Sequence, residues 1–520
     1  MNIKNKNLLI NKCYVNGVWV NSDKKIKVIN PATRDLIAEV PNFGKKETIN
    51  AIDSAELAFK SWSKFTAHER SKILKKWYDL VIDNQDDLAT IMTAEQGKPL
   101  SEAKGEIVYA ANFIEWFAEE AKRVYGDVLP DPIKDKRMIT LKQPIGVCAA
   151  ITPWNFPAAM ITRKCAPGLA AGCTFVIKPA EQTPLTAIAF VVLAEQAGFP
   201  KGVINIITGE PEEIGKEITS NPKVRKISFT GSTAVGRILM QQSANTVKKL
   251  SLELGGNAPF IVFDDCDIDA AVEGLMLGKF RNTGQVCVSP NRIYVQEKIY
   301  DNFVKKVVEV IKKLKIGDGL KGETQLGPLI DDAAIAKVEE HIKDAVVKGA
   351  TIELGGKRHA LGGRFFEATV LANVNESMKL ANEETFGPVA PFFKFKTEQE
   401  VIDLANNTEF GLAAYFFSKD IARIWRVAEA IEAGMIGINT GIFASAYMPF
   451  GGIKQSGIGR EGAKYGMEEY LELKTLSFGN IKYNDKLANG DCARKLNDKF
   501  IDVKLIVEKV VTGMVDGITT

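Results

Sequence analysis

Histidine is scarce in this sequence, and cysteine is scattered along it rather than paired. Only three of the 520 residues are histidine, and none of the seven cysteines forms a C-x-x-C pair. This pattern excludes the usual zinc-site spacing and a disulfide framework, so we expect no bound metal. A cysteine protease would need a histidine as its base, and His68, His341 and His359 all lie in charged stretches typical of a protein surface.

Net charge and long apolar runs are also nearly absent. The 67 Lys and Arg residues almost balance the 64 Asp and Glu residues, which leaves a net charge of +3. So small a charge provides no general attraction to nucleic acid. No run approaches the roughly 18 to 20 apolar residues of a membrane-spanning helix. The first apolar run, LLI, is too short for a secretory signal. We therefore expect no nucleic-acid partner, no membrane attachment, and a cytoplasmic protein with reduced thiols.

The hydrophobic patterning indicates an α/β fold. Hydrophobic residues make up 46% of the chain and charged residues 25%, the ordinary balance of a folded protein. Residues 69–83 and 300–315 carry apolar side chains at helical spacing, and the runs between such helices are short and β-branched. Runs of this kind begin at Gly146, Thr174, Val203 and Lys226. Strands that alternate with helices predict βαβ units and a mostly parallel sheet.

The same pattern continues later in the chain and suggests a second α/β lobe. Runs such as APFIVFDD and GPVAPFFKF follow the LELGG stretch, so we place the boundary near residues 252–256. Residues 131–144 differ, because proline and charge flank a short alternating run typical of a β-ribbon. After about residue 480 the pattern weakens, and residues 483–520 could be a helix, a strand or a simple extension.

Cys287 is the first candidate for chemistry. It follows small polar residues in the run NTGQVC, where deep packing is not expected. A thiolate can add to a carbonyl carbon, so Cys287 could act as a nucleophile. The alternative is a small core residue. We expect that role for Cys148, Cys165, Cys173 and Cys266.

Further polar candidates lie where strands end. Glu253, in SLELGG, could be the base that histidine does not provide; the alternative is a solvated strand carboxylate. Asn155, in PWNFP, could donate to an oxyanion or belong to a rigid turn. Lys178 follows the strand TFVI, and open α/β sheets bind ligands at such strand ends. In FTGSTAVG, Ser232 or Thr233 could cap a phosphate-binding helix, although a true G-x-G-x-x-G is absent.

Taken together, these motifs resemble the aldehyde dehydrogenase superfamily. The runs that carry the resemblance, in order, are PWNFP, KPAEQTP, FTGSTAVG, LELGGNAP, RNTGQVC, EETFGPV and PFGGIKQSGIGREG. It extends from about residue 13 to residue 480. The runs NFPAAMITRK, GLAAYFFS and GREGAKYGMEEYLELK look most like succinate-semialdehyde dehydrogenases.

The resemblance implies a role for each matching residue. Cys287 would attack the aldehyde to give a thiohemiacetal, whose oxyanion Asn155 would hold, and hydride loss to a nicotinamide would leave a thioester. Glu253 would then activate the hydrolytic water. The implied cofactor contacts are Trp154, Lys178, Glu181, Gly231, Ser232, Leu254, Glu384 and Phe386. We expect NAD as the preferred cofactor and NADP as the alternative, because the Glu181 carboxylate would face the 2′-phosphate of NADP.

The resemblance also implies how a substrate acid would be recognised. Two arginines grip the distal carboxylate in semialdehyde enzymes, and they match Arg163 and Arg281. Each could instead pair with a nearby acidic side chain. An assisting serine of some relatives falls on Ala444, with Ser445 beside it as a third substrate-binding candidate. Ser289 replaces a second cysteine of some relatives, which removes a simple disulfide switch.

The resemblance therefore implies an oxidoreductase that converts succinate semialdehyde to succinate. Alternatives are a glutarate-semialdehyde enzyme, a CoA-acylating aldehyde dehydrogenase, which Glu253 argues against, and a non-enzymatic binding protein. The implied fold has a Rossmann-like NAD(P)-binding domain (1–127 and 144–254) and an α/β catalytic domain (255–465). A β-ribbon (128–143 and 466–482) would join subunits into a homodimer or homotetramer, and the role of residues 483–520 is unknown.

Overall fold

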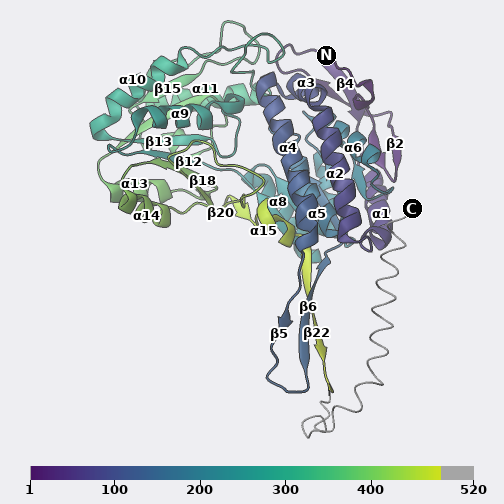
Figure 1. Ribbon diagram of the computed structural model, residues 1–520. Coiled ribbons are helices and arrows are strands. Elements are labelled where there is room, and N and C mark those ends of the chain that lie inside the picture. The colour runs from purple at the N-terminus through teal and green to yellow at the C-terminus, as the bar shows by residue number, and fades with distance from the viewer. Residues whose placement is uncertain (1, 482–520) are drawn as a thin grey trace. The chain divides into compact units, whose positions relative to one another are not determined.

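The short β-branched runs form two separate sheets in the computed structural model, which describes residues 2–481 (Figure 1). The described chain divides into two units. One unit comprises residues 2–124 and 143–472 and contains both large sheets, and the other comprises residues 125–142 and 473–481. The 483–520 extension of the sequence prediction lies outside the described residues.

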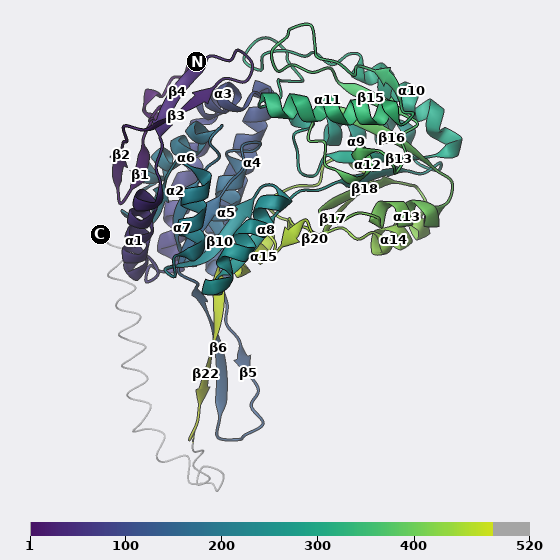
Figure 2. The same cartoon turned by 180° about the vertical axis from the view of Figure 1, so that it is seen from behind.

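The first large sheet has eight strands and a parallel centre. Its order is β2 (Val18–Val20), β1 (Cys13–Val15), β9 (Ile204–Ile206), β8 (Thr174–Lys178), β7 (Val147–Ile151), β10 (Val224–Thr230), β11 (Lys249–Glu253) and β21 (Gly457–Ile458). The strands from β9 to β11 are parallel, whereas β1, β2 and β21 pair antiparallel at the edges. Helices cover both faces of the parallel centre (Figure 2), and the central strands β7 and β8 are accordingly apolar along most of their length.

The second large sheet has seven strands. Its order is β14 (Thr351–Leu354), β15 (Thr369–Ala372), β16 (Val389–Phe395), β13 (Pro290–Gln296), β12 (Ala258–Val262), β18 (Ala413–Phe417) and β19 (Met435–Ile438). Only β14 pairs antiparallel. The chain leaves the first sheet at Glu253 and enters the second at Ala258, within and just beyond the LELGG stretch. The predicted α/β fold class, with a Rossmann-like part and a second α/β part, is confirmed.

Three small sheets complete the strand set. Their strands are β3 (Lys25–Ile29) with β4 (Leu36–Pro41), β17 (Phe410–Gly411) with β20 (Ile453–Lys454), and β5 (Val128–Leu129) with β6 (Arg137–Pro144) and β22 (Leu471–Phe478). Most of the last sheet belongs to the smaller unit and is an extended ribbon, as the sequence predicted for residues 131–144.

Fifteen α-helices are described. They are α1 (Lys45–Trp62), α2 (Ala67–Asp83), α3 (Gln85–Gln96), α4 (Leu100–Glu120), α5 (Ala159–Ala171), α6 (Pro184–Ala197), α7 (Pro211–Ser220), α8 (Thr233–Ser243), α9 (Ile268–Lys279), α10 (Tyr300–Ile311), α11 (Asp332–Val347), α12 (Lys379–Asn382), α13 (Glu398–Asn406), α14 (Ile421–Ala430) and α15 (Ala463–Glu468). The helix predicted at residues 69–83 is α2. Thr66 and Glu69 form a capping box at its first turn, an arrangement worth about 1 kcal/mol.

Successive residues of β7 pack into two different hydrophobic cores, one on each face of the first sheet. Cys148 and Ala150 pack in the core that includes residues of α2, α4, α5 and α6. Val147 and Ala149 pack in the core that includes residues of α1, α7 and α8. This division follows from the two-residue period of a strand. Because both faces are covered, ligands can approach the parallel strands only at their ends.

Side-chain burial confirms the predicted core role of four cysteines and shows that the predicted surface position of one histidine is wrong. The side chains of Cys148, Cys165, Cys173 and Cys266 are buried. His341, which the charged sequence around it placed on the surface, is 1% exposed. Its Nδ1 lies 3.2 Å from Thr385 Oγ1, and its Nε2 lies 3.3 Å from a Glu383 carboxylate oxygen. No helix among residues 2–481 is long and apolar enough to cross a membrane.

Candidate active site

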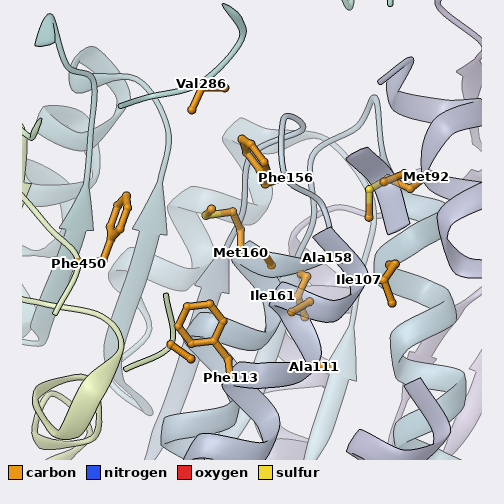
Figure 3. Close-up of a cluster of buried hydrophobic side chains, with 14 of the residues drawn as sticks. Met92, Ile107, Ala111, Phe113, Phe156, Ala158, Met160, Ile161, Val286 and Phe450 are labelled. Atoms are coloured by element: carbon orange, nitrogen blue, oxygen red, sulfur yellow. The ribbon is translucent and has the colours of Figure 1, made fainter. Parts of the chain in front are cut away.

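Two cavities of the larger unit meet at the side chain of Cys287. The first has a volume of about 300 Å³ and also contains both predicted substrate arginines, Arg163 and Arg281. Its remaining lining residues are Lys98, Glu102, Gly105, Glu106, Tyr109, Phe156, Met160, Val286, Val288, Ala444 and Phe450. Figure 3 shows four of the apolar lining residues, Phe156, Met160, Val286 and Phe450. Ala444 thus lines the cavity, whereas the candidate Ser445 is not among the described residues that do so.

The second cavity, of about 340 Å³, gathers most of the predicted cofactor contacts. Those that line it are Trp154, Gly231, Ser232, Leu254, Glu384 and Phe386, together with Asn155 and Cys287. Lys178 and Glu181 are not among its described lining residues. They instead form an ion pair with each other just beyond β8. The sequence prediction therefore assembled residues from five separate motifs around one space.

Backbone geometry before Cys287 explains how its loop presents the thiol. The short helix η4 (Arg281–Gly284) contains Asn282 and Thr283 in the left-handed region, with φ of 49° and 57°. Gly284 follows at φ 75°, and a Cβ there would lie 2.1 Å from the Gly387 carbonyl oxygen. Only glycine fits such a close approach. The turn is therefore held against the segment that carries Glu384 and Phe386.

A buried network orients Asn155, which lies between β7 and α5. The Asn155 side-chain amide donates to the Gln285 carbonyl at 3.0 Å. The Asn155 carbonyl accepts from Lys98 Nζ at 2.8 Å and from Asn282 Nδ2 at 3.0 Å. Lys98 is in turn ion-paired with Glu106, and both side chains are at most 2% exposed. Buried polar groups satisfied in this way are rigid, so Asn155 has little freedom to turn from the cavity.

Glu253 ends β11 and is buried, so the alternative of a solvated strand carboxylate is wrong. One carboxylate oxygen, Oε2, lies 3.4 Å from Arg163 Nη2. The other, Oε1, has no hydrogen-bond partner among residues 2–481. Burial raises the pKa of Glu253, while the charge of Arg163 opposes that rise. A carboxyl group with a raised pKa and a free oxygen is equipped to accept a proton.

The Cys287 thiol is half-buried and close to Glu253. Burial raises the thiol pKa well above its usual value, and the negative charge of Glu253 raises it further. Arg163 acts in the opposite direction. Burial, aided by the charge of Glu253, therefore favours the protonated thiol over the thiolate, so activation of Cys287 requires loss of this proton.

Arg163 and Arg281 differ in their surroundings. Arg163, on α5, is ion-paired with Glu461 as well as with Glu253, so its predicted alternative, pairing with an acidic side chain, is realised. The neighbouring Lys164 also contacts Glu461, with Nζ 2.6 Å from Oε1. For Arg281, the guanidinium carbon lies 5.4 Å from the Phe156 ring centre, and its buried Nε has no hydrogen-bond partner among the described residues. Of the two arginines in the first cavity, Arg281 thus has fewer interactions with the surrounding side chains than Arg163.

The second cavity has features that could hold a dinucleotide. Ser232 Oγ caps α8 by accepting from Val235 N at 3.3 Å, so amides of a helix N-terminus lie beside this space. A Cβ on Gly231 would lie 2.4 Å from the Phe229 ring, which requires glycine there. Trp154 and Phe386 pack edge to face with ring centres 5.6 Å apart.

Several residues of the site escaped sequence reasoning. Lys98, Glu106 and Tyr109 lie far upstream of the quoted motifs, on or just before α4, and Lys337 is on α11. Glu461 stands inside the quoted run GREG, but its pairing with α5 is not visible in the sequence. The only signal for the α4 group is the charged residues that recur at helical spacing in EQGKPLSEAKGE.

Comparisons with known proteins show what this chain is similar to. A model of the aldehyde dehydrogenase family matches residues 19–476. The chain is 59% identical over 483 residues to a glutarate-semialdehyde dehydrogenase of Pseudomonas aeruginosa, covering 92% of this chain and 100% of the relative. It is 58% identical over 481 residues to an NADP⁺ succinate-semialdehyde dehydrogenase of Escherichia coli, with coverage of 92% and 100%. A crystal structure of succinate-semialdehyde dehydrogenase from Burkholderia pseudomallei superimposes with a TM-score of 0.92, at 59% identity and coverage of 92% and 100%.

Proposed function

Because this chain belongs to the aldehyde dehydrogenase family and is an oxidoreductase, we propose that it oxidises succinate semialdehyde to succinate with NAD(P). The single observation that carries the proposal is the position of Cys287. Its side chain lines both a cavity with two arginines and a cavity with features of a dinucleotide site. A nucleophile at that junction can hold a carbonyl carbon beside a hydride acceptor.

In the first half-reaction, the Cys287 thiol loses its proton to solvent and its sulfur bonds to the aldehyde carbon. The π bond of the carbonyl breaks with its electrons on oxygen, which becomes an oxyanion. The Asn155 side-chain amide lines the second cavity next to Cys287 and can donate to that oxygen. The Gln285 carbonyl fixes the Asn155 amide, while Lys98 and Asn282 fix the Asn155 backbone carbonyl. A donor fixed in this way needs no reorganisation as the charge develops, and it is worth about 3 kcal/mol. When bound, a nicotinamide dinucleotide supplies the acceptor for the hydride that leaves the thiohemiacetal carbon.

In the second half-reaction, Glu253 removes a proton from water. The water oxygen adds to the thioester carbon, the carbon–sulfur bond breaks, and the acid and the Cys287 thiolate are released. Glu253 Oε1 has no hydrogen-bond partner among residues 2–481, and this availability supports its role as the proton acceptor. The same role argues against a CoA-acylating enzyme, which does not need a base for water.

The acid group of the substrate is recognised by a cation. A carboxylate entering a cavity lined by aromatic and aliphatic side chains must pair with a positive group to offset its lost hydration. Arg281 is suited to this because it lines the cavity and its Nε has no hydrogen-bond partner in the part of the chain that the structure describes. Arg163 is the second cation of the same cavity. The two relatives above act on four- and five-carbon semialdehydes by name, so glutarate semialdehyde is the second candidate substrate.

The test of this function compares succinate semialdehyde with butanal, which has the same carbon chain and no carboxylate. We expect a much higher kcat/KM for the semialdehyde. Arg281→Ala should raise the KM for succinate semialdehyde, with a loss of about 2 to 4 kcal/mol in transition-state binding, and should change butanal oxidation far less. Initial rates of reduced-cofactor formation measure both substrates.

Arg281→Lys provides the matched control. It keeps the charge but not the planar fork of donors, so it should recover only part of the lost binding. Equal losses of kcat/KM on both aldehydes would mean that Arg281 supports the structure of the site and does not bind the substrate carboxylate. Because Ala444 lines the cavity in place of an assisting hydroxyl, glutarate semialdehyde should also be accepted. Strong rejection of it would contradict that expectation.

The same assays with NAD and NADP test the cofactor preference. The Glu181 carboxylate accepts hydrogen bonds from ribose hydroxyls but repels a 2′-phosphate. We therefore expect kcat/KM to be about tenfold or more higher with NAD, a difference of about 1.4 kcal/mol. Lys178 is already ion-paired with Glu181, so Lys178 is less available to bind the 2′-phosphate. Glu181→Ser should narrow the difference, and equal or better efficiency of the unmodified enzyme with NADP would contradict the assignment.

We propose the following domain organisation, oligomeric state and location for the enzyme. Residues 1–127 and 144–254 would bind the cofactor and residues 255–465 would carry catalysis. The ribbon (128–143 and 466–482) would join subunits of a homodimer or homotetramer. The reaction suits the reducing cytoplasm, because a reactive thiol such as Cys287 must stay unoxidised to work.

A further inference from the structure

Arg163 contacts the proposed base at one edge of its guanidinium and the substrate cavity at another. Nη2 lies 3.4 Å from Glu253 Oε2, and Nε is ion-paired with Glu461. The guanidinium carbon lies 4.1 Å from the centre of the Phe450 ring, which lines the same cavity. The Arg163 side chain is 1% exposed, so its charge acts on the buried groups around it, which are Glu461, Tyr109, Glu253 and Cys287, with little screening by water.

The charges of this buried group are balanced before a substrate enters. Arg163 and Lys164 supply two positive charges, and Glu253 and Glu461 supply two negative charges. Of the ion pairs between them, the contact from Arg163 to Glu253 is the longest, at 3.4 Å. A third carboxylate placed beside Arg163 therefore disturbs this contact most easily. It adds a negative charge that the group cannot neutralise.

We propose that Arg163 is a positioning residue through which the substrate's own carboxylate releases Glu253. Without a carboxylate in the cavity, Arg163 holds Glu253 and weakens it as a base. A substrate carboxylate that binds the Arg163 guanidinium from the cavity weakens the ion pair between Arg163 and Glu253. The inference rests on the proposed function, because it assumes that Glu253 serves as the base for deacylation.

The released base acts in one defined step. Glu253 takes one proton from water, the water oxygen bonds to the acyl carbon, and the carbon–sulfur bond to Cys287 breaks with its electrons on sulfur. A carboxylate that is no longer paired with a cation binds protons more strongly, so it removes the proton from water more readily. Substrates with an acid group would then be hydrolysed faster for a reason separate from their tighter binding.

Acetaldehyde and acetate provide the direct test, because together they match succinate semialdehyde divided at its central carbon–carbon bond. Acetaldehyde acylates Cys287 and leaves the distal part of the cavity free for acetate. At saturating acetaldehyde, we expect acetate to raise the steady rate of reduced-cofactor formation about fivefold or more. Acetamide, which is neutral and nearly the same size, should leave the rate unchanged.

Variants identify the residue responsible. In Arg163→Met, acetate should no longer accelerate turnover, because no guanidinium connects it to Glu253. In the matched variant Arg281→Met, acceleration should persist at higher acetate concentrations, since the link through Arg163 remains. The proposal would be overturned if acetate still accelerates turnover in Arg163→Met. It would also be overturned if acetate does not accelerate turnover in the unmodified enzyme.

A cofactor-free reaction gives a second readout and does not require any variant to fold. 4-Nitrophenyl acetate can acylate a thiol without oxidation, and release of 4-nitrophenolate after the first turnover then reports deacylation. We expect acetate to raise the plateau of this rate and to move its acidic midpoint to higher pH, because losing a cation raises the pKa of Glu253. The charged and titratable groups that act on Glu253 are Arg163, Lys164, Glu461, Cys287 and Glu384. An unchanged midpoint would mean that Arg163 holds Glu253 only as a structural support.

The two proposals fail in different ways. If succinate semialdehyde is not oxidised in preference to butanal, the proposed function is wrong. If it is preferred but acetate has no effect on acetaldehyde oxidation or on 4-nitrophenyl acetate hydrolysis, the proposed function stands and only the release of Glu253 by the substrate is wrong.

Discussion

Replacing Cys287 by alanine should lower the rate of aldehyde oxidation by about 10⁴-fold or more. Both half-reactions use the sulfur as the atom bonded to the acyl carbon, and water cannot replace it at that position. Of the cysteines in residues 2–481, only Cys287 lines the two cavities, so no other described thiol can substitute. The rate of reduced-cofactor formation with succinate semialdehyde measures the loss.

The control for this variant is Cys266→Ala. Cys266 is also a free, largely buried thiol in the lobe of the second sheet, but it lines neither cavity. It should keep near-normal activity and a similar midpoint of thermal unfolding. Turnover by Cys287→Ala at more than about one-hundredth of the normal rate would mean that the nucleophile is another residue.

Glu253→Gln should separate the two half-reactions. We expect a burst of about one reduced cofactor per active site, followed by a steady rate lower by about 10²-fold or more, because the thioester no longer has a base for its water. The burst should survive because the negative charge of Glu253 raises the pKa of Cys287, and glutamine removes that charge. Rapid-mixing absorbance measures the burst, and intact-protein mass spectrometry should detect the succinyl adduct.

Hydroxylamine distinguishes a stalled thioester from a damaged site. It is a stronger nucleophile than water and can release the acyl group without a base, so it should restore part of the steady rate in Glu253→Gln. Glu253→Asp keeps a carboxylate on a shorter side chain and should retain intermediate activity. Full turnover in Glu253→Gln, or a variant that forms no adduct, would show that Glu253 does not have the assigned role.

Much of this site could be predicted because its motifs follow strand ends. Asn155 follows β7, Ser232 follows β10, and Glu253 ends β11, and these strands are parallel neighbours in one sheet. Parallel strands place their carboxyl ends along the same edge, so residues from distant motifs meet there without any further information. Cys287 could be selected from seven cysteines because small polar residues precede it.

The partners of these residues could not be predicted in the same way. Arg163 lies 90 residues from Glu253, and Lys164 lies 297 residues from Glu461, yet each pair is in contact. His341 is surrounded in the sequence by charged residues, but the face of α11 that carries it turns inward to Thr385. A helical sequence with charges on most sides does not specify which face packs, because the neighbouring segments decide that.

By itself, the sequence determined the α/β class, the family and the residue types that can perform thioester chemistry, because these follow from local periodicity and short motifs. Only the tertiary structure decided that Cys287 lines two cavities, that Glu253 is buried with one oxygen unpartnered among the described residues, and that Arg163 is already paired. Burial and charge pairing set the pKa values and the accessible oxygen atoms. Both depend on segments brought together from distant parts of the chain, which no local pattern records.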